Sequence, residues 1–167
     1  MNQTIRIAKK VSLFVWAVCL SSGLEVSAEH AKVELTIESQ GKQVTSFVDQ
    51  TPPEIGKSPR PVLEVKAGDP IRVQWFFQNV YPNKTLKDVV MHFYVAKAEK
   101  VGQKEVPDTT GEVELETAFD MDFKPGAKAG ARSRFVIDKP GVYMVRVESR
   151  QTQSDHEHFA AVDLIVK

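Results

Sequence analysis

Apolar and polar residues alternate along most of this chain, and the alternation is clearest in its last hairpin. In residues 142–148, Tyr143, Val145 and Val147 fall on one side of an extended chain and the residues between them on the other. On the return segment, 159–166, one side holds Ala160, Val162, Leu164 and Val166. A period of two residues is that of a half-buried β-strand, so the chain is predicted to end in a strand docked into a sheet.

The same period recurs from residue 33 onward, with turn residues between the segments and no convincing helical period. Residues 71–78 are the most apolar segment and Trp75 is its largest side chain, so we expect Trp75 in the core. Residues 89–96 are apolar on both sides, which predicts a strand inside a sheet. The predicted strands are 33–38, 43–48, 62–65, 71–78, 89–96, 112–123, 133–137, 142–148 and 159–166.

About eight or nine short strands without helices predict an all-β fold, an antiparallel β-sandwich. Asp138 through Tyr143 resembles the turn and the opening of the penultimate strand in immunoglobulin-like and fibronectin-type sandwiches. The resemblance implies that Tyr143 folds back to hydrogen-bond the backbone and that Trp75 is the core tryptophan of such a domain. The expected fold class is therefore an immunoglobulin-like β-sandwich. The antibody family itself is excluded, because its inter-sheet disulfide is absent.

The first 28 residues have the features of a secretory signal peptide. Arg6, Lys9 and Lys10 precede an apolar run, 11–20, and small residues follow at Val26-Ser27-Ala28. We expect cleavage after Ala28 and a single sandwich domain over 29–167, located in the periplasm or outside the cell. The apolar run is too short to span a bilayer comfortably, so no membrane span is expected after cleavage.

The charge balance and the single cysteine exclude several classes of function. The chain has 22 Lys and Arg against 22 Asp and Glu, so it offers no electrostatic case for binding nucleic acid or an anionic membrane. Cys19 is lost with the predicted signal peptide. The mature chain therefore has no disulfide, and without a thiolate it is not a blue-copper electron-transfer protein.

A second resemblance is carried by Pro140-Gly141-Val142-Tyr143, then Ser154-Asp155-His156, then a final strand. This order resembles the C-terminal end of the periplasmic copper-carrier β-sandwiches related to copper-resistance proteins. That family binds Cu(II) with its mature N-terminal histidine and with an aspartate and a histidine in this loop. The resemblance implies a Cu(II) site at Asp155, His156 and His30. This chain departs from the family in having Glu157 two residues after Asp155, and His30 as the second mature residue.

The residues themselves also suggest a metal site in the last loop. His156 and His158 are two positions apart, so in an extended chain both imidazoles point the same way. If the first and last strands pair in parallel, His30 would join them, with Asp155 or Glu157 nearby. Nitrogen and oxygen ligands suit Cu(II) or Zn(II). The alternative is a solvated polar loop with two surface histidines.

Other chemistry-bearing residues favour structural roles. His92 shares a side with Val90 and Tyr94, which predicts a hydrogen-bonded histidine rather than a ligand. Glu112, Glu114 and Glu116 predict a solvated acidic strand face, with a calcium site as the alternative. No Gly-x-Ser-x-Gly elbow supports a hydrolase.

The leading hypothesis is an exported, non-catalytic β-sandwich that binds or supports an unknown protein or envelope component, without a resident cofactor. The alternative is a periplasmic Cu(II) or Zn(II) carrier that uses His156, His158, His30 and Asp155. An enzyme is the third hypothesis. Asn83-Lys84-Thr85 matches the N-glycosylation sequon, which matters only in a host with that machinery.

Overall fold

The structure is a computed structural model that describes residues 31–49, 60–103, 113–151 and 154–167. Within these ranges, no helix is long and apolar enough to cross a membrane. The strands are β1 (Ala31–Ser39), β2 (Lys42–Asp49), β3 (Val62–Val65), β4 (Ile71–Asn79), β5 (Leu86–Ala98), β6 (Val113–Phe123), β7 (Lys128–Phe135), β8 (Gly141–Gln151) and β9 (Ser154–Val166).

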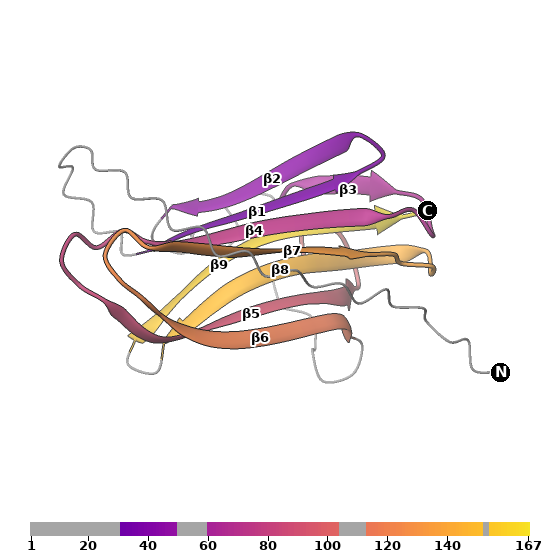
Figure 1. The fold of residues 1–167 in the computed structure, drawn as a ribbon. Helices are drawn as coiled ribbons and strands as arrows, with labels where there is room; N and C mark the ends of the chain where they lie inside the picture. Colours follow the sequence, from indigo (N-terminus) through magenta and orange to yellow (C-terminus); the bar gives the residue numbers. More distant parts are fainter. Residues whose placement is uncertain (1–30, 50–59, 104–112, 152–153) are drawn as a thin grey trace.

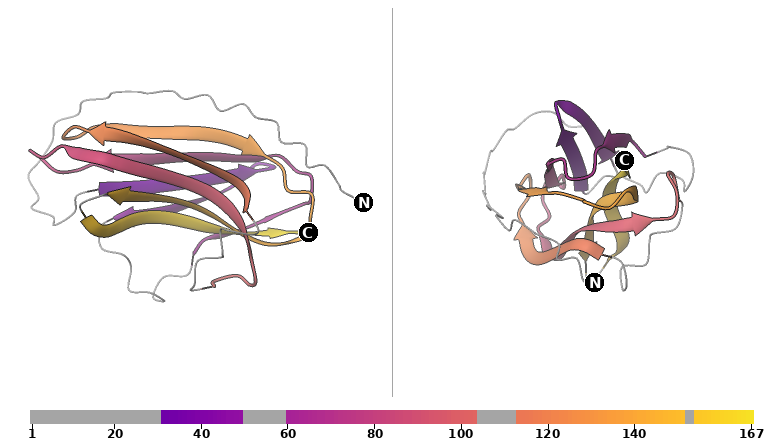
Figure 2. Two further views of the ribbon diagram at one scale, coloured as in Figure 1. Left: turned by 90° about the horizontal axis from the view of Figure 1, so that it is seen from below. Right: turned by 90° about the vertical axis from the view of Figure 1, so that its right-hand side faces the viewer.

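The nine strands form two sheets that pack against each other (Figure 1, with two further views in Figure 2). The four-stranded sheet has the order β2-β1-β4-β7 and the five-stranded sheet the order β3-β9-β8-β5-β6. All neighbours are antiparallel except β3 and β9, which are parallel. The predicted β-sandwich of about nine strands is confirmed, and β5 lies inside its sheet as its two apolar sides predicted.

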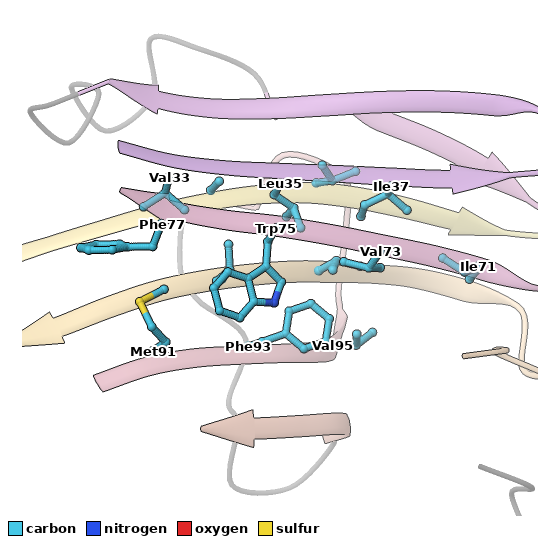
Figure 3. Packing of buried hydrophobic residues seen from close by; sticks show 14 of the residues in the cluster. Val33, Leu35, Ile37, Ile71, Val73, Trp75, Phe77, Met91, Phe93 and Val95 are labelled. Carbon is cyan, nitrogen blue, oxygen red and sulfur yellow. The ribbon is translucent and has the colours of Figure 1, made fainter. Parts of the chain in front are cut away.

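The inner faces of the two sheets form one apolar core. Trp75 of β4 is buried there and stacks on Phe119 of β6, with the ring centroids 5.6 Å apart. Figure 3 shows Trp75 between the strands, close to Phe93 of β5. The predicted core position of Trp75 is therefore confirmed. Burial of an aromatic side chain of this size contributes a few kcal/mol to the stability of the fold.

Strand β7 begins five residues earlier than its predicted counterpart, 133–137. Its first half contains Ala129, Gly130 and Ala131, whose small side chains give almost no apolar pattern. Gly130 is small for a packing reason, because a Cβ there would lie 2.1 Å from the backbone oxygen of Trp75 and 2.6 Å from Phe76 Cδ1. The close approach of β4 to β7 thus removed the signal that would have predicted the strand.

One predicted feature of immunoglobulin-like sandwiches is present. Tyr143 Oη donates a 2.9 Å hydrogen bond to the carbonyl oxygen of Lys139, so the predicted fold-back of this tyrosine is confirmed. The edge strand β3 runs parallel to β9. The tryptophan differs: in immunoglobulin domains it lies in the sheet that carries the tyrosine corner, whereas Trp75 lies on β4 of the opposite sheet.

The predicted parallel pairing of the first and last strands is wrong. A tight turn at Gln40 and Gly41, both with positive φ, places β2 on one edge of β1, and β4 occupies the other edge. No edge of β1 is left for β9, whose parallel partner is β3. Strands β1 and β9 instead face each other from opposite sheets and run in the same direction (Figure 1).

Candidate functional site

The predicted metal site lies only partly within the described residues. His158 of β9 is 6 % exposed and pairs in register with Ser149 of β8. It alternates in phase with Ala160 and Val162, so it faces the interior of the sandwich rather than a loop surface. His30 and the side chains of Asp155 and His156 lie outside the described residues. Among the side chains that the structure describes, no group of three or more His, Asp or Glu is placed to hold a metal ion.

The outer face of the five-stranded sheet carries a buried ionic cluster. Glu148 of β8 is its centre: Oε2 accepts a 2.7 Å hydrogen bond from Nε of Arg146, and Oε1 lies 2.8 Å from Nη2 of Arg150. His92 of β5 adds a third partner, with Nδ1 3.4 Å from Oε1 of Glu148 and Nε2 2.6 Å from Oε1 of Glu116. We call these five residues the Glu148 cluster. His92 is thus hydrogen-bonded, as predicted.

Strand alternation builds this cluster. Residues 146, 148 and 150 of β8 point to one face because side chains repeat every two residues, and the antiparallel register sets His92 opposite Glu148. The guanidinium of Arg146 lies 4.0 Å from the ring centroid of Phe159 on β9, which adds a cation–π contact. The sequence places Arg146 and Glu148 on the outer face, but their burial has no local signal.

Asp163 of β9 is a second buried carboxylate on this face. Oδ1 accepts a 2.9 Å hydrogen bond from Nε of Arg60, and Oδ2 accepts one of 2.6 Å from the backbone N–H of Gly102. Arg60 also donates to the carbonyl oxygen of Gln103 at 2.6 Å. Asp163 therefore ties the segment before β3 and the loop after β5 to the last strand.

Both buried carboxylates have their oxygens occupied by protein donors. A general base or nucleophile needs an oxygen that can reach a substrate. Each oxygen of Glu148 and Asp163 instead accepts from a cation or a backbone N–H within the fold. The two carboxylates therefore hold neighbouring segments of the fold together.

The outer face of the four-stranded sheet differs in its charge. The outward positions of β4 and β7 are Arg72, Gln74, Phe76, Gln78, Lys128, Gly130, Arg132 and Arg134. These eight positions hold four cations and no acid. We call them the basic face; on the same side of the sheet, β1 carries Lys32, Glu34 and Glu38. The chain as a whole is neutral, so the excess of positive charge on this face is local.

Cross-strand register brings like charges together on the basic face. Arg72 lies directly opposite Arg134, and Gln74 lies opposite Arg132. Arg72 reaches Glu38 of β1 at 3.2 Å, and Nε of Arg132 donates to Gln74 Oε1 at 3.0 Å. The structure gives Arg134 no carboxylate partner among the described residues. Like charges directly opposite each other on a sheet are destabilising, and here the ion pair with Glu38 meets the charge of Arg72 alone.

An aromatic ring lies across the middle of the basic face. Phe76 is opposite Gly130, and the ring occupies the space that a side chain at 130 would need. Nζ of Lys128 sits 4.1 Å from the centroid of that ring. Phe47 of β2 belongs to the same cross-strand row, on the far side of Glu34, and is 66 % exposed.

Comparison with known proteins gives likenesses of fold only. No known family and no curated protein matches the sequence. The C-terminal domain of Wzt superposes with a TM-score of 0.44 and 13 % identity, over 97 % of this chain and 82 % of that one. The soluble domain of PmoD from a Methylocystis species gives 0.41 and 14 %, over 86 % and 95 %.

A family 123 glycoside hydrolase from Clostridium perfringens gives a TM-score of 0.40 and 12 % identity. The alignment covers 68 % of this chain, but the chain spans only about a quarter of the hydrolase, 24 %. At these levels of similarity, none of the three proteins indicates what this chain binds or does.

Proposed function

We propose that the chain is an exported, non-catalytic β-sandwich that binds another molecule through the basic face. The observation that carries this proposal is the pairing of Arg72 with Arg134 on adjacent strands, among outward positions of β4 and β7 that hold four cations and no acid, with Glu38 of β1 beside Arg72. A like-charge pair costs stability in the free protein. A ligand of opposite charge would relieve that repulsion, so the cost is understandable in a binding surface.

The buried carboxylates support the non-catalytic part of the proposal. Glu148 and Asp163 are held by cations and by a backbone N–H, which leaves their oxygens committed to the fold. Export is supported by the first 28 residues, which have the features of a secretory signal peptide and would direct the mature chain to the periplasm or outside the cell. The binding partner is then a component of the cell envelope or its surroundings.

Site-specific photo-crosslinking tests the binding surface without knowledge of the ligand. A photoreactive amino acid at Gln78 lies on the basic face and leaves all four cations in place. The same group at Asp120, an exposed position on β6 of the other sheet, is the control. With the native envelope fraction we expect adducts from position 78 that disappear when Arg132→Gln and Arg134→Gln are added. Equal adduct yields from the two positions, or no adducts at all, would contradict the proposal.

A metal carrier is the second candidate, and one observation favours it. Strands β1 and β9 begin at Ala31 and Ser154 and run in the same direction, so the starts of the two strands lie at the same end of the sandwich (Figure 1). A carrier would bind one Cu(II) or Zn(II) through His30, His156, His158 and Asp155. Its affinity should fall as the pH drops through ~6.5, because imidazole binds metal only when it is neutral.

Titration of the mature protein with Cu(II) tests this candidate. The double variant His156→Ala, His158→Ala should bind more weakly than wild type. His92→Gln is the matched control, because His92 lies on the outer face of the five-stranded sheet and His158 faces inward. Equal Cu(II) affinity of wild type and the double variant would remove the metal-carrier candidate.

A further inference from the structure

We infer that the ligand of the basic face is a linear acidic polysaccharide whose carboxylates pair with Arg72, Arg132 and Arg134. This inference rests on the function proposed above and adds the chemical class of the ligand. It is carried by the kind of cation present, by the neutral side chains between the cations, and by the flatness of the face.

The kind of cation favours carboxylate groups. Three of the four cations on the basic face are arginines. The planar guanidinium offers two parallel N–H donors, a geometry that matches a carboxylate in a bidentate pair. Arg132 and Arg134 are two residues apart on one strand, which spaces their Cα atoms by about 6–7 Å. A regular polymer with acidic groups at short intervals can therefore meet both.

The neutral side chains favour a hydroxyl-rich polymer. Gln74 lies opposite Arg132, from which its Oε1 accepts a hydrogen bond, and Gln78 lies opposite Lys128; the NH₂ group of each amide can donate to a hydroxyl. On the adjoining strands, the hydroxyls of Thr36 and Thr45 are hydrogen-bonded to each other at 3.0 Å. Phe47, 66 % exposed in the same cross-strand row as Phe76, offers an aromatic surface to the C–H face of a sugar ring.

The flatness of the face favours an extended chain. Gly130 has no side chain and Phe76 lies across it, so the two strands present a low surface between Lys128 and Arg132. A single-stranded nucleic acid is the other extended polyanion. Its binding surfaces combine a continuous basic groove with several stacking aromatics, whereas β4 and β7 present a single outward ring, Phe76, with Lys128 over it.

The test measures binding of the mature protein to polygalacturonate, a linear polysaccharide with one carboxylate on each sugar, with dextran as the uncharged control. Wild type should bind polygalacturonate and not dextran, and more weakly as salt increases. Arg132→Gln with Arg134→Gln should weaken binding at least ~10-fold, because two charge-assisted pairs are lost. Lys66→Gln with Lys100→Gln removes two exposed charges elsewhere and should change the affinity less than ~2-fold.

Several results would overturn the assignment. Binding that is equal in the two double variants would show that the basic face is not used. If the protein bound a single-stranded oligonucleotide as tightly as polygalacturonate, the basic face would bind polyanions in general rather than an acidic polysaccharide. A concentration-dependent dimer in sedimentation that is lost in Arg132→Gln, Arg134→Gln would assign the face to a second copy of the chain.

The two proposals fail in different ways. Crosslinks from position 78 to a protein, without polygalacturonate binding, would overturn the ligand class and leave the binding surface in place. Loss of crosslinks and of polygalacturonate binding together would overturn both.

Discussion

The outer faces of the two sheets both carry ion pairs, but these pairs differ in how far they are buried. On the five-stranded sheet, Arg146 and Glu148 form an ion pair whose side chains are 8 % and 2 % exposed. On the four-stranded sheet, Arg72 and Glu38 form one whose side chains are 64 % and 39 % exposed. The buried charge of Glu148 is matched by cationic partners, whereas the basic face has an excess of cations.

Solvent explains the difference. A buried charge without a partner costs several kcal/mol, so the Glu148 cluster must be matched for the chain to fold. An exposed charge is hydrated and screened, so the basic face can keep Arg134 opposite Arg72 at a small cost. Unmatched charge is therefore tolerated where it remains accessible to a ligand.

The largest expected effect on stability comes from removing the buried charge of Glu148. Glu148→Gln removes the buried negative charge between Arg146 and Arg150 and with it the 2.7 Å ion pair of Arg146. We expect a loss of about 3–5 kcal/mol in the free energy of unfolding by urea. The matched variant Glu38→Gln on the exposed face should cost less than about 1 kcal/mol. Equal losses in the two variants would remove the distinction between the faces.

An intermediate effect is expected from Gly130→Ala on the basic face. The added Cβ would overlap the backbone oxygen of Trp75 and the ring of Phe76, so β7 must move away from β4. The expected cost is about 1–3 kcal/mol, as for overpacking in a core. Ala131→Gly is the control, because it sits on the same strand and removes a side chain instead. A fully stable Gly130→Ala would show that the two strands are not in close contact.

The sequence predicted the strands better than it predicted either face. Period-two alternation or an apolar run marked all nine strands, because the inner faces are apolar along their length. It failed at the start of β7, where Ala129 and Gly130 are small so that β4 can approach. The arrangement of charges on the two outer faces could not be predicted. The pairing of Arg72 with Arg134 and of His92 with Glu148 depends on strand register, which joins residues far apart in the chain.

The burial of Glu148 was also out of reach. Alternation put it on the outer face together with Arg146, and an outer face is usually solvated. Its low exposure depends on tertiary packing, which has no local signature. The last-loop histidines were the most visible chemical signal in the sequence, but the interior position of His158 was not predicted from it.

A small gain in stability is expected from relieving the like charges on the exposed face. Arg134→Gln removes the cation opposite Arg72 and breaks no ion pair among the described residues. We expect the free energy of unfolding to rise by up to about 0.5 kcal/mol at low salt, and the gain to disappear at high salt. Arg72→Gln should gain less, because it also loses the contact with Glu38. A loss of stability in Arg134→Gln would indicate that Arg134 is not repelled by its neighbour.

The smallest effect is expected at an exposed ion pair on the rim of the five-stranded sheet. A 2.7 Å hydrogen bond from Nζ of Lys167 to Oε2 of Glu64, and then the charge of Lys167, hold the pKa of Glu64 below its ordinary value of 4.5. A carboxyl whose pKa is lowered by folding adds stability above its unfolded pKa, and this stability is lost as the pH falls through the folded pKa. Wild type should therefore be slightly more stable than Lys167→Gln at pH 7, in low salt.

That difference should shrink as the pH falls below 4.5 and should also vanish at high salt, because both side chains are more than half exposed. Lys66→Gln removes a nearby exposed charge and is the control. The measurement is thermal unfolding of wild type, Lys167→Gln and Lys66→Gln between pH 7 and pH 3. The loss of stability in Lys167→Gln should be much smaller than the loss in Glu148→Gln. A difference between wild type and Lys167→Gln that persisted in acid and in salt would mean that Lys167 stabilises the sheet edge by packing rather than by charge.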